Sequence, residues 1–377
     1  MVGLVSSQHS PPSKFISLNR QIIVAVIFCV FAIANVRKQN FLSNLEAYEE
    51  GIVFSNHVGY FNLSCPFEMA KFSCAFLERS DADRARTTTS RDYYFENLNV
   101  VHRAFWKAFG SKNHLRKKRI FMIGDSLTRQ LFIALVCNAF ELHNAILDHV
   151  VVPWKDSWPC VSGHACTIRG GNHSGFDAAS AIFRGGTELH FVPHHGWRDR
   201  NTSEEHALER LSEEIRNTGM VTFGKKTALP PGGPVDVLAY NVGVHFDGQN
   251  FRDEVDFFAN KVGFPLMNNE LNNTHSRPQI IYTTTPTQHF HTPNGVFNKE
   301  IVKKGGFWNC MDRVESNPRA DVEKKILSPG VNVDVLLDYD DLDKGVMHVG
   351  KSDCSHYCMP GVPDIVAARL LDVIFAT

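Results

Sequence analysis

The sequence predicts an α/β fold in which a central parallel sheet has helices on both faces, a three-layer α/β/α arrangement. Strand-like and helix-like segments alternate from about residue 118 onward, and such alternation is typical of a parallel sheet. Hydrophobic residues make up 43% of the chain, with 28 Phe among them, which is enough to build a sizeable core. The short apolar run 119–123 ends directly before a glycine, which indicates a strand.

The elements are predicted in chain order. The strand at 119–123 is followed by a helix at 127–140, in which Leu127, Leu131 and Leu135 share one broad face. Later strands are expected at 188–192, 235–240, 279–282 and 333–337, and helices at 203–216, 252–262 and 364–375. The segments 37–117 and 142–187 are long and irregular for such a fold, so we expect disulfides to pin them as covers over the functional site. One domain with these elaborations is the expected arrangement.

The N-terminus predicts a targeting segment. Residues 22–36 form an apolar run broken only by Asn35. Lys14 and Arg20 precede it and no acidic residue does, as in a signal peptide or a signal anchor. The run is shorter than the roughly 20 residues that span a bilayer comfortably, and the small-residue pattern at 32–34 suits cleavage. Arg37 and Lys38 directly after the run disfavour cleavage and favour an anchor. A buried helix of a soluble protein remains the third interpretation.

The expected organisation has four parts. These are a short cytosolic tail at 1–20, an anchor or signal peptide at 21–36, a stem at 37–60 and a luminal domain at 61–377. The formal net charge of −1, from 39 basic and 40 acidic residues, argues against a nucleic-acid-binding surface, which would need an excess or a stripe of basic residues.

The cysteines agree with an exported chain. Eight follow the apolar segment, an even count that predicts four disulfides without specifying the pairing. They are Cys65, Cys74, Cys137, Cys160, Cys166, Cys310, Cys354 and Cys358. Glycosylation sequons, also compatible with export, begin at Asn62, Asn172, Asn201 and Asn272.

The first motif with chemical content is Gly124-Asp125-Ser126-Leu127, between the first strand and its helix. A serine there lies at a helix N-terminus, where backbone N–H groups and the helix dipole favour negative charge. The tetrahedral intermediate of an ester reaction carries such a charge on its oxyanion. Ser126 is therefore a candidate nucleophile, although a helix N-cap is the alternative role for a serine at this position.

The second motif, at 353–361, contains Asp353 and His356. A spacing of three lets a turn hold the carboxylate against the imidazole, while the other ring nitrogen faces a serine. A surface ion pair is one alternative. A zinc site is another, built from His356, Cys354 and Cys358 together with Cys160, His164 and Cys166.

Together the two motifs resemble the SGNH (GDSL-like) acyl-ester hydrolase fold, and within it the plant trichome-birefringence-like family of polysaccharide O-acetyltransferases, also called the PC-esterase group. Residues 124–137 are similar to the family's GDS block, including a cysteine on its helix. Residues 353–364 are similar to its terminal DxxH block. Cys65 and Cys74 look like its upstream cysteine segment. The likeness covers roughly 60–377, densely at the two ends and thinly between them.

The sequence also departs from the family. Members usually carry an Asn-Thr-Gly-His-Trp-Trp block after the third strand, whereas residues 241–246 read Asn-Val-Gly-Val-His-Phe and lack the tryptophans. The Gln-Pro-rich stretch before the GDS block is missing as well. The resemblance implies three oxyanion donors: the Ser126 N–H, the side chain of Asn241 and a backbone glycine. Gly196 is the choice by position for that glycine, and Gly171 is its rival.

The resemblance implies a Golgi O-acetyltransferase, a single-pass type II membrane protein with a luminal catalytic domain, or alternatively a secreted one. Ser126 would be the nucleophile, His356 the base and Asp353 the residue that orients it. The partners would be an acetyl donor and a glycan acceptor, with no metal or cofactor. An acetylesterase with the same triad and a non-catalytic glycan-binding protein are the alternatives. Further candidates for substrate contact are His194, His195, His289, His291, Trp154, Trp158, Trp197 and Trp308.

Overall fold

The computed structural model divides the chain into two compact units, Met1–Tyr60 and Phe61–Thr377. All residues that the structure describes belong to the second unit, and the predicted tail, anchor and stem lie outside them. The described residues are 81–109, 117–143, 147–152, 166–168, 179–183, 187–193, 213, 234–246, 248–268, 277–298, 300, 310–339, 342, 347–350 and 353–376. Within these ranges no helix is both long enough and apolar enough to cross a membrane.

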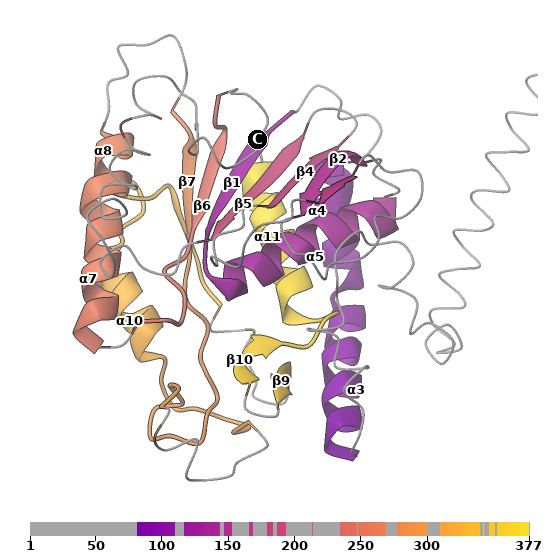
Figure 1. Ribbon diagram of the computed structural model, residues 1–377, viewed down its shortest axis with the longest axis vertical. Coiled ribbons are helices and arrows are strands. Elements are labelled where there is room, and N and C mark those ends of the chain that lie inside the picture. The colour runs from indigo at the N-terminus through magenta and orange to yellow at the C-terminus, as the bar shows by residue number, and fades with distance from the viewer. Residues whose placement is uncertain are drawn as a thin grey trace, which may run out of the picture. The chain divides into compact units, whose positions relative to one another are not determined.

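An eight-stranded sheet forms the centre of the second unit (Figure 1). The strands lie in the order β3 (Cys166–Ile168), β2 (Leu147–Val152), β4 (Ala179–Phe183), β5 (Glu188–Pro193), β1 (Arg119–Gly124), β6 (Val237–Tyr240), β7 (Gln279–Thr283) and β8 (Val335–Leu337). The pairs β2–β4 and β4–β5 are antiparallel and the other neighbours are parallel. The α/β class is therefore confirmed. The predicted parallel sheet is present from β5 to β8, but the whole sheet is mixed, because β4 runs antiparallel to its neighbours.

Strand β1 is an inner strand of the sheet and pairs in parallel with β5 on one side and β6 on the other. Every residue of β1 is buried, as expected for a strand covered on both faces. Five parallel strands lie side by side in the order β5, β1, β6, β7 and β8. If these five are numbered by their order along the chain, the order across the sheet is 2-1-3-4-5. In sheets of this order ligands bind at the carboxyl ends of the first and third strands, where the chain switches direction. The loops after β1 and β6 are thus the expected location of a site.

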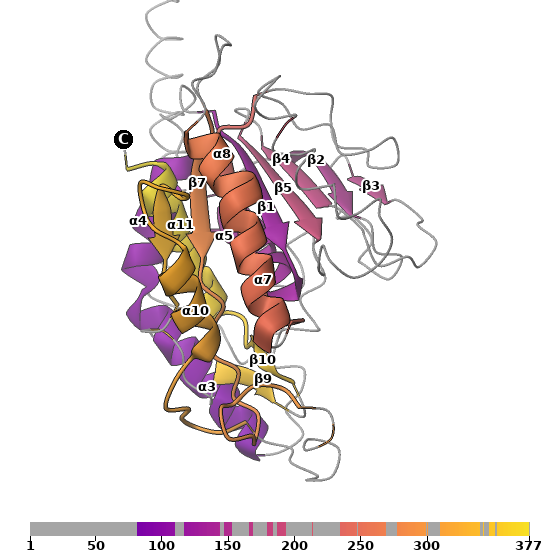
Figure 2. The ribbon, with the colours of Figure 1, turned by 90° about the vertical axis from the view of Figure 1, so that its left-hand side faces the viewer.

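Helices cover both faces of the sheet (Figures 1 and 2). On one face α5 (Ser126–His143) packs against β1 and β5, and α11 (Val362–Ile374) packs against α5 and α4 (Leu98–Phe109). On the other face α7 (Gly248–Phe258) contacts α10 (Pro318–Ile326), and the chain continues from α7 through η2 (Ala259–Gly263) into α8 (Phe264–Met267). The described part of the second unit therefore has three layers.

The core beneath α7 is aromatic. Phe258 of α7 stacks on Tyr240 of β6 with ring centroids 4.1 Å apart, and Tyr282 of β7 lies 5.4 Å from Phe258. All three side chains are fully buried. Aromatic pairs at such distances contribute about 0.5–1.5 kcal/mol beyond the burial of their area. This cluster fixes α7 on β6 and β7, whose carboxyl ends lead into the site.

Several predicted elements are confirmed within a few residues of their bounds. The strands expected at 119–123, 188–192, 235–240, 279–282 and 333–337 correspond to β1, β5, β6, β7 and β8. The helices expected at 127–140, 252–262 and 364–375 correspond to α5, to α7 with η2, and to α11. Most of the helix expected at 203–216 lies outside the residues that the structure describes.

The two segments expected to be irregular contain regular structure instead. Helices α3 (Asp81–Glu96) and α4 lie in the first segment, and strands β2, β3 and β4 lie in the second. Helix α4 buries Val101, Ala104, Phe105 and Ala108, which follow the i, i+3, i+4, i+7 spacing of an amphipathic helix. The sequence thus contained the signal for α4. The strands, at three to six residues each, are too short to show a clear period.

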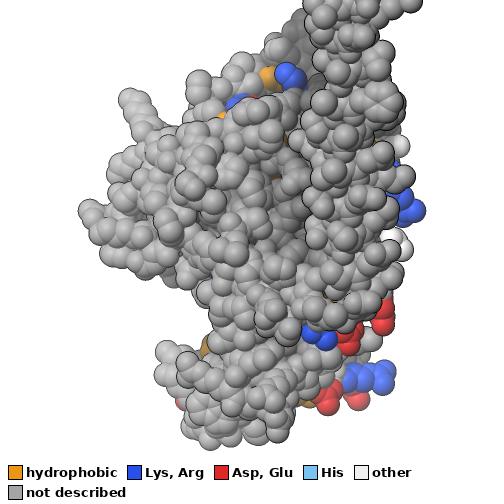
Figure 3. Space-filling model, turned by 90° about the vertical axis from the view of Figure 1, so that its right-hand side faces the viewer, with side chains coloured by type: hydrophobic (Ala, Val, Ile, Leu, Met, Phe, Trp, Pro, Cys, Tyr) orange, Lys and Arg blue, Asp and Glu red, His pale blue; other side chains and the backbone are white. Residues whose placement is uncertain are grey.

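The described charges are mixed in sign. On the face that Figure 3 shows, basic and acidic side chains of described residues lie side by side along one edge. This distribution agrees with the balanced net charge of the chain.

Candidate active site

The turn between β1 and α5 is shaped by Asp125, whose side chain is fully buried. Its Oδ1 accepts a hydrogen bond from the Leu127 N–H at 2.9 Å and its Oδ2 accepts one from the Val244 N–H at 2.8 Å. Asp125 therefore caps the first turn of α5 and ties that turn to the loop after β6. Because Asp125 takes the capping role, the hydroxyl of Ser126 is available for another contact.

Two glycines allow this close packing. A Cβ atom on Gly124 would lie 2.1 Å from Thr128 Oγ1 and 2.9 Å from the Asn241 carbonyl oxygen. Gly243 has a φ of +83°, and a Cβ there would lie 2.1 Å from Asp125 Oδ2. A larger residue at either position would displace the turn that carries Ser126 or the loop after β6.

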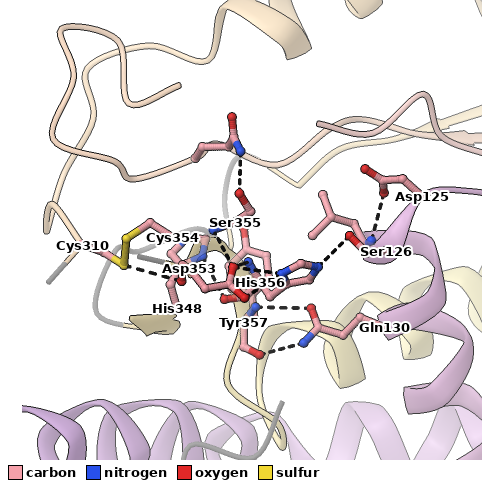
Figure 4. A network of polar contacts seen from close by, with 12 residues as sticks. Asp125, Ser126, Gln130, Cys310, His348, Asp353, Cys354, Ser355, His356 and Tyr357 are labelled. Carbon is pink, nitrogen blue, oxygen red and sulfur yellow. Dashed lines mark hydrogen bonds and ion pairs between the residues drawn. A yellow bond between two sulfur atoms is a disulfide. The ribbon is translucent and has the colours of Figure 1, made fainter. Parts of the chain in front are cut away.

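Ser126 contacts His356 directly. Ser126 Oγ lies 2.7 Å from His356 Nε2, although the two residues are 230 positions apart in the sequence (Figure 4). The other ring nitrogen, Nδ1, lies 2.9 Å from both carboxylate oxygens of Asp353. Asp353 accepts from Nδ1–H, so Nε2 is left to accept the serine proton. The structure thus brings together the nucleophile, base and orienting residue that the sequence predicted, in the arrangement of a catalytic triad.

The Asp353 carboxylate is held in its charged form. Burial acts to raise its pKa, but the hydrogen bond and the charge of His356 lower it more, together with backbone N–H groups. Those groups belong to His356, at 3.1 Å from Oδ1, and to Ser355, at 3.4 Å. The net pKa of Asp353 is below its usual value. Asp353 can therefore orient the imidazole and stabilise its positive charge.

His356 lies on β10 (Asp353–Tyr357), which pairs with β9 (His348–Gly350). The expected turn around Asp353 is thus the start of a short, irregular strand. A disulfide joins Cys354 of this strand to Cys310, and the Tyr357 ring stacks on His348 with centroids 4.4 Å apart. Ser90 of α3 donates to the carbonyl oxygens of Cys358 and Pro360, just after the strand. The strand is thereby anchored on both sides of His356.

Asn241 lies at the carboxyl end of β6, where the resemblance assigns a side-chain oxyanion donor. Its Nδ2 donates to the Thr283 carbonyl oxygen at 2.6 Å and to Thr285 Oγ1 at 3.3 Å. Among the described residues its Oδ1 has no hydrogen-bond donor, although it is buried. Asn241 would have to exchange one of its partners to donate to an oxyanion, and that role stays a prediction. Gly196 and Gly171 lie outside the described residues.

Two of the cysteines in the alternative zinc site are oxidised and cannot bind the metal. Cys354 is bonded to Cys310, and Cys358 is also disulfide-bonded, so neither sulfur is the thiolate that zinc requires. Both ring nitrogens of His356 are engaged by Ser126 and Asp353. Over the described ranges, no group of three or more potential His, Cys, Asp or Glu ligands is placed to hold a metal.

Of the other candidates for substrate contact, His289 makes contacts within the protein. His289 Nδ1 lies 2.8 Å from the Met311 carbonyl oxygen, and the His289 ring packs against His348. His289 is therefore built into the support of β9. His291, in the loop after β7, is half-buried, and its contact with a substrate stays a prediction. The candidates His194, His195, Trp154, Trp158, Trp197 and Trp308 lie outside the part of the chain that the structure describes, as do Cys160, His164 and the side chain of Cys166.

Sequence reasoning missed four polar side chains around the triad. Gln130 lies one helical turn after Ser126, on the same side of α5, and this spacing could have identified it. His245, partly exposed, has its Nε2 3.7 Å from Asp125 Oδ2. Gln288 and Arg319 are buried, and Gln288 contacts Ser355 of β10. No local pattern distinguishes these last two, because their contacts join distant segments.

Compared with models of known protein families and with curated proteins, the chain matches none of them.

Proposed function

We propose that the chain is a serine-dependent O-acetyltransferase that moves an acetyl group onto a glycan hydroxyl. The observation that carries this proposal is the 2.7 Å contact between Ser126 Oγ and His356 Nε2, with Asp353 on the opposite nitrogen. A serine with an oriented base in hydrogen-bond reach is the arrangement that activates a hydroxyl as a nucleophile. The residues of this triad perform each step without a metal or a bound cofactor.

In the first half-reaction His356 Nε2 takes the proton of Ser126 while Oγ attacks the acetyl carbonyl carbon of the donor. The resulting tetrahedral intermediate carries its negative charge on the former carbonyl oxygen. When the intermediate collapses, the bond to the donor's leaving group breaks and His356 returns the proton to that group. The product is an acetyl ester of Ser126.

The oxyanion of the intermediate would lie at the N-terminus of α5. The Ser126 N–H belongs to the first turn of that helix, where the helix dipole also favours negative charge. A donor of this kind stabilises charge that develops only in the transition state. Asn241 and a glycine, Gly196 or its rival Gly171, complete the donor set that the resemblance implies.

In the second half-reaction a glycan hydroxyl gives its proton to His356 and attacks the acetyl-Ser126 carbonyl. The second tetrahedral intermediate collapses with release of the acetylated glycan, and the proton returns to Ser126. Asp353 stays ionised throughout, because its pKa lies below the usual value. The proton balance closes on His356 in both halves.

The family resemblance extends this proposal to fold type and location. The nucleophile follows the inner strand β1 and the base lies near the C-terminus, which supports an SGNH-type fold. The disulfide between Cys310 and Cys354 supports an oxidising compartment such as the secretory lumen. We infer a luminal catalytic domain in the Golgi, held by the segment at 21–36.

An acetylesterase is the second candidate, and one observation favours it. Ser126 is partly exposed, and the His356 side chain retains 13% of its accessible surface. Water can therefore reach the acyl-enzyme and replace the sugar hydroxyl as the acceptor. The two activities share the first half-reaction and differ only in how well the site excludes water from the second.

The nucleophile is tested by labelling with a fluorophosphonate, which reacts with activated serines. We expect labelling of the wild type at Ser126, identified by peptide mass spectrometry, and no labelling of Ser126→Ala. Ser328→Ala, which changes an exposed serine away from the triad, serves as the matched control and should label normally. An unlabelled wild-type protein would contradict the enzyme proposal and favour a non-catalytic glycan-binding protein.

The acceptor is tested with 4-nitrophenyl acetate as the donor, in the presence and absence of plant cell-wall oligosaccharides. A transferase yields acetylated oligosaccharide by mass spectrometry, at the expense of free acetate. An esterase releases acetate at a rate that the oligosaccharides do not change. Both products should be absent with Ser126→Ala.

A further inference from the structure

Arg319 is a buried charged residue on α10 that lies outside the triad. Its side chain is surrounded by acceptors from two other segments: Gln288 Oε1 lies 2.5 Å from Nη1, and the Phe246 carbonyl oxygen lies 2.9 Å from Nη2. A third acceptor, the Val244 carbonyl oxygen, lies 3.3 Å from Nη2. Only 5% of the Arg319 surface is exposed. A buried guanidinium is costly unless its donors are satisfied, so these contacts define its place closely.

One branch of these contacts leads to the base of the triad. The Gln288 carboxamide accepts from Arg319 and also from the Phe297 N–H at 3.2 Å. Both bonds fall on Oε1, which turns Nε2 towards Ser355. Nε2 donates to Ser355 Oγ at 2.5 Å, and Ser355 directly precedes His356. The orientation of Gln288 set by Arg319 therefore holds β10 at the residue next to the imidazole.

The other branch leads to the nucleophile. The carbonyl oxygen of Val244 accepts from Arg319, and the N–H of the same residue donates to Asp125 Oδ2 at 2.8 Å. Asp125 directly precedes Ser126 and caps its helix. Through these hydrogen bonds the Arg319 guanidinium is connected both to Ser355, the residue before His356, and to Asp125, the residue before Ser126.

We propose that Arg319 is a positioning residue that sets the distance between Ser126 and His356, through Gln288 and Ser355 on one side and through Val244 and Asp125 on the other. This inference rests on the proposed function, because it concerns the same triad. Arginine suits the role since its planar fork donates in several fixed directions, whereas a lysine ammonium is a single point charge. A displacement of about 1 Å between reacting groups reduces rate by about a hundredfold.

A purely structural role is the competing explanation. The Arg319 guanidinium also lies over the Phe251 ring of α7, 5.7 Å from its centroid, and it contributes to the electrostatic environment of Glu323. Loss of these contacts would weaken the fold without necessarily moving the triad. The test therefore needs a readout that stability alone does not change.

The experiment measures the rate constant of fluorophosphonate labelling at Ser126, with kcat and KM for 4-nitrophenyl acetate, well below each variant's melting temperature. We expect Arg319→Lys to slow labelling by about ten- to a hundredfold, with kcat reduced and KM nearly unchanged. Arg277→Lys is the matched control. Arg277 forms a bidentate ion pair with Asp334 at the opposite end of β7 from the site, so this variant should label at the wild-type rate.

A double-variant cycle then separates positioning from stability. Ser355→Ala removes the acceptor of Gln288 without touching Arg319, and it should also slow labelling. If both residues act through one chain of contacts, the variant with both changes should be little slower than the slower single variant. The proposal would be overturned if the rate reductions of the two single variants multiplied in the double variant. It would also be overturned if folded Arg319→Lys were labelled at the wild-type rate. Absence of Ser126-dependent labelling in the wild type would instead contradict the proposed function itself.

Discussion

Gln130 and Tyr357 pair like two residues of adjacent strands, although one belongs to helix α5 and the other to strand β10 (Figure 4). The Gln130 Nε2 donates to the Tyr357 carbonyl oxygen at 2.7 Å, and its Oε1 accepts from the Tyr357 N–H at 3.3 Å. Gln130 lies one turn after Ser126, and Tyr357 directly follows His356. A single buried carboxamide therefore joins the helix of the proposed nucleophile, Ser126, to the strand of the proposed base, His356.

Replacing Gln130 by leucine should destabilise the fold and slow the labelling of Ser126. The buried N–H and carbonyl of Tyr357 would each lose this partner, at about 1–3 kcal/mol apiece. Gln130→Glu keeps the acceptor but loses the donor, so we expect an intermediate effect. Urea denaturation and labelling rates measure the two consequences. Gln249→Leu, at an exposed glutamine of α7, is the control. If Gln130→Leu were as stable as this control and its Ser126 were labelled as fast, the Gln130–Tyr357 contact would have no role in stability or reactivity.

Gly243 and Gly330 form a matched pair for testing the nucleophile turn. Both have positive φ, +83° and +81°, but only a Cβ at Gly243 would meet another group, Asp125, within 4 Å. Alanine at either position should lower stability by about 1 kcal/mol or more through backbone strain. Only Gly243→Ala should also reduce Ser126 labelling strongly, because it displaces Asp125. Equal labelling by the two folded variants would argue against a role for this close contact.

The disulfide between Cys310 and Cys354 should support both stability and activity. It closes a loop with a sequence separation of 44, for which chain entropy predicts a stabilisation of about 4 kcal/mol. Cys354 directly follows Asp353, so the loss of the bond should also loosen the orienting carboxylate. The variant with both cysteines changed to alanine avoids a free thiol. We expect it to unfold at lower temperature and to label more slowly at 20 °C, a temperature chosen to keep it folded. Unchanged labelling would limit the bond to a role in stability.

Asp364 should make stability depend on pH. This buried carboxyl caps α11, with its oxygens accepting from the Gly361 N–H and the Asn138 amide. Burial raises its pKa to about 6 from a usual value of 3.8, despite those hydrogen bonds. Between these values the folded protein keeps the proton that the unfolded chain has released, so the free energy of unfolding falls as pH rises, by about 1.4 kcal/mol per unit.

Asp364→Asn should remove this pH dependence. The unfolding free energy of the wild type relative to the variant should fall from about pH 4 to pH 6 and then level off. Urea denaturation at four pH values across that range measures the difference. Asp312→Asn, at an exposed position, controls for the general effect of removing a negative charge. If the difference in unfolding free energy between the wild type and Asp364→Asn were the same at every pH, the carboxyl would not titrate in this window.

Local patterns in the sequence were sufficient for the central elements. The run 119–123 and the apolar face that includes Leu131 and Leu135 predicted β1 and α5, because period and burial are properties of neighbouring residues. The three-residue spacing of Asp353 and His356 likewise predicted their contact, which forms within one short strand. Helix α4 also had a readable period, whereas the three- to six-residue strands β2, β3 and β4 did not.

The sequence by itself thus determined the α/β class, the turn that carries Ser126 and the local Asp–His pair. The tertiary structure decided that His356 reaches Ser126 across 230 positions and that Asn241 directs its amide towards Thr283 and Thr285. It also decided that Gln130 contacts Tyr357 and that Arg319 contacts Gln288. The physical reason is that hydrogen bonds between distant segments depend on how strands and helices pack. The direction in which two elements pack produces no periodic pattern in the sequence of the residues that form those bonds.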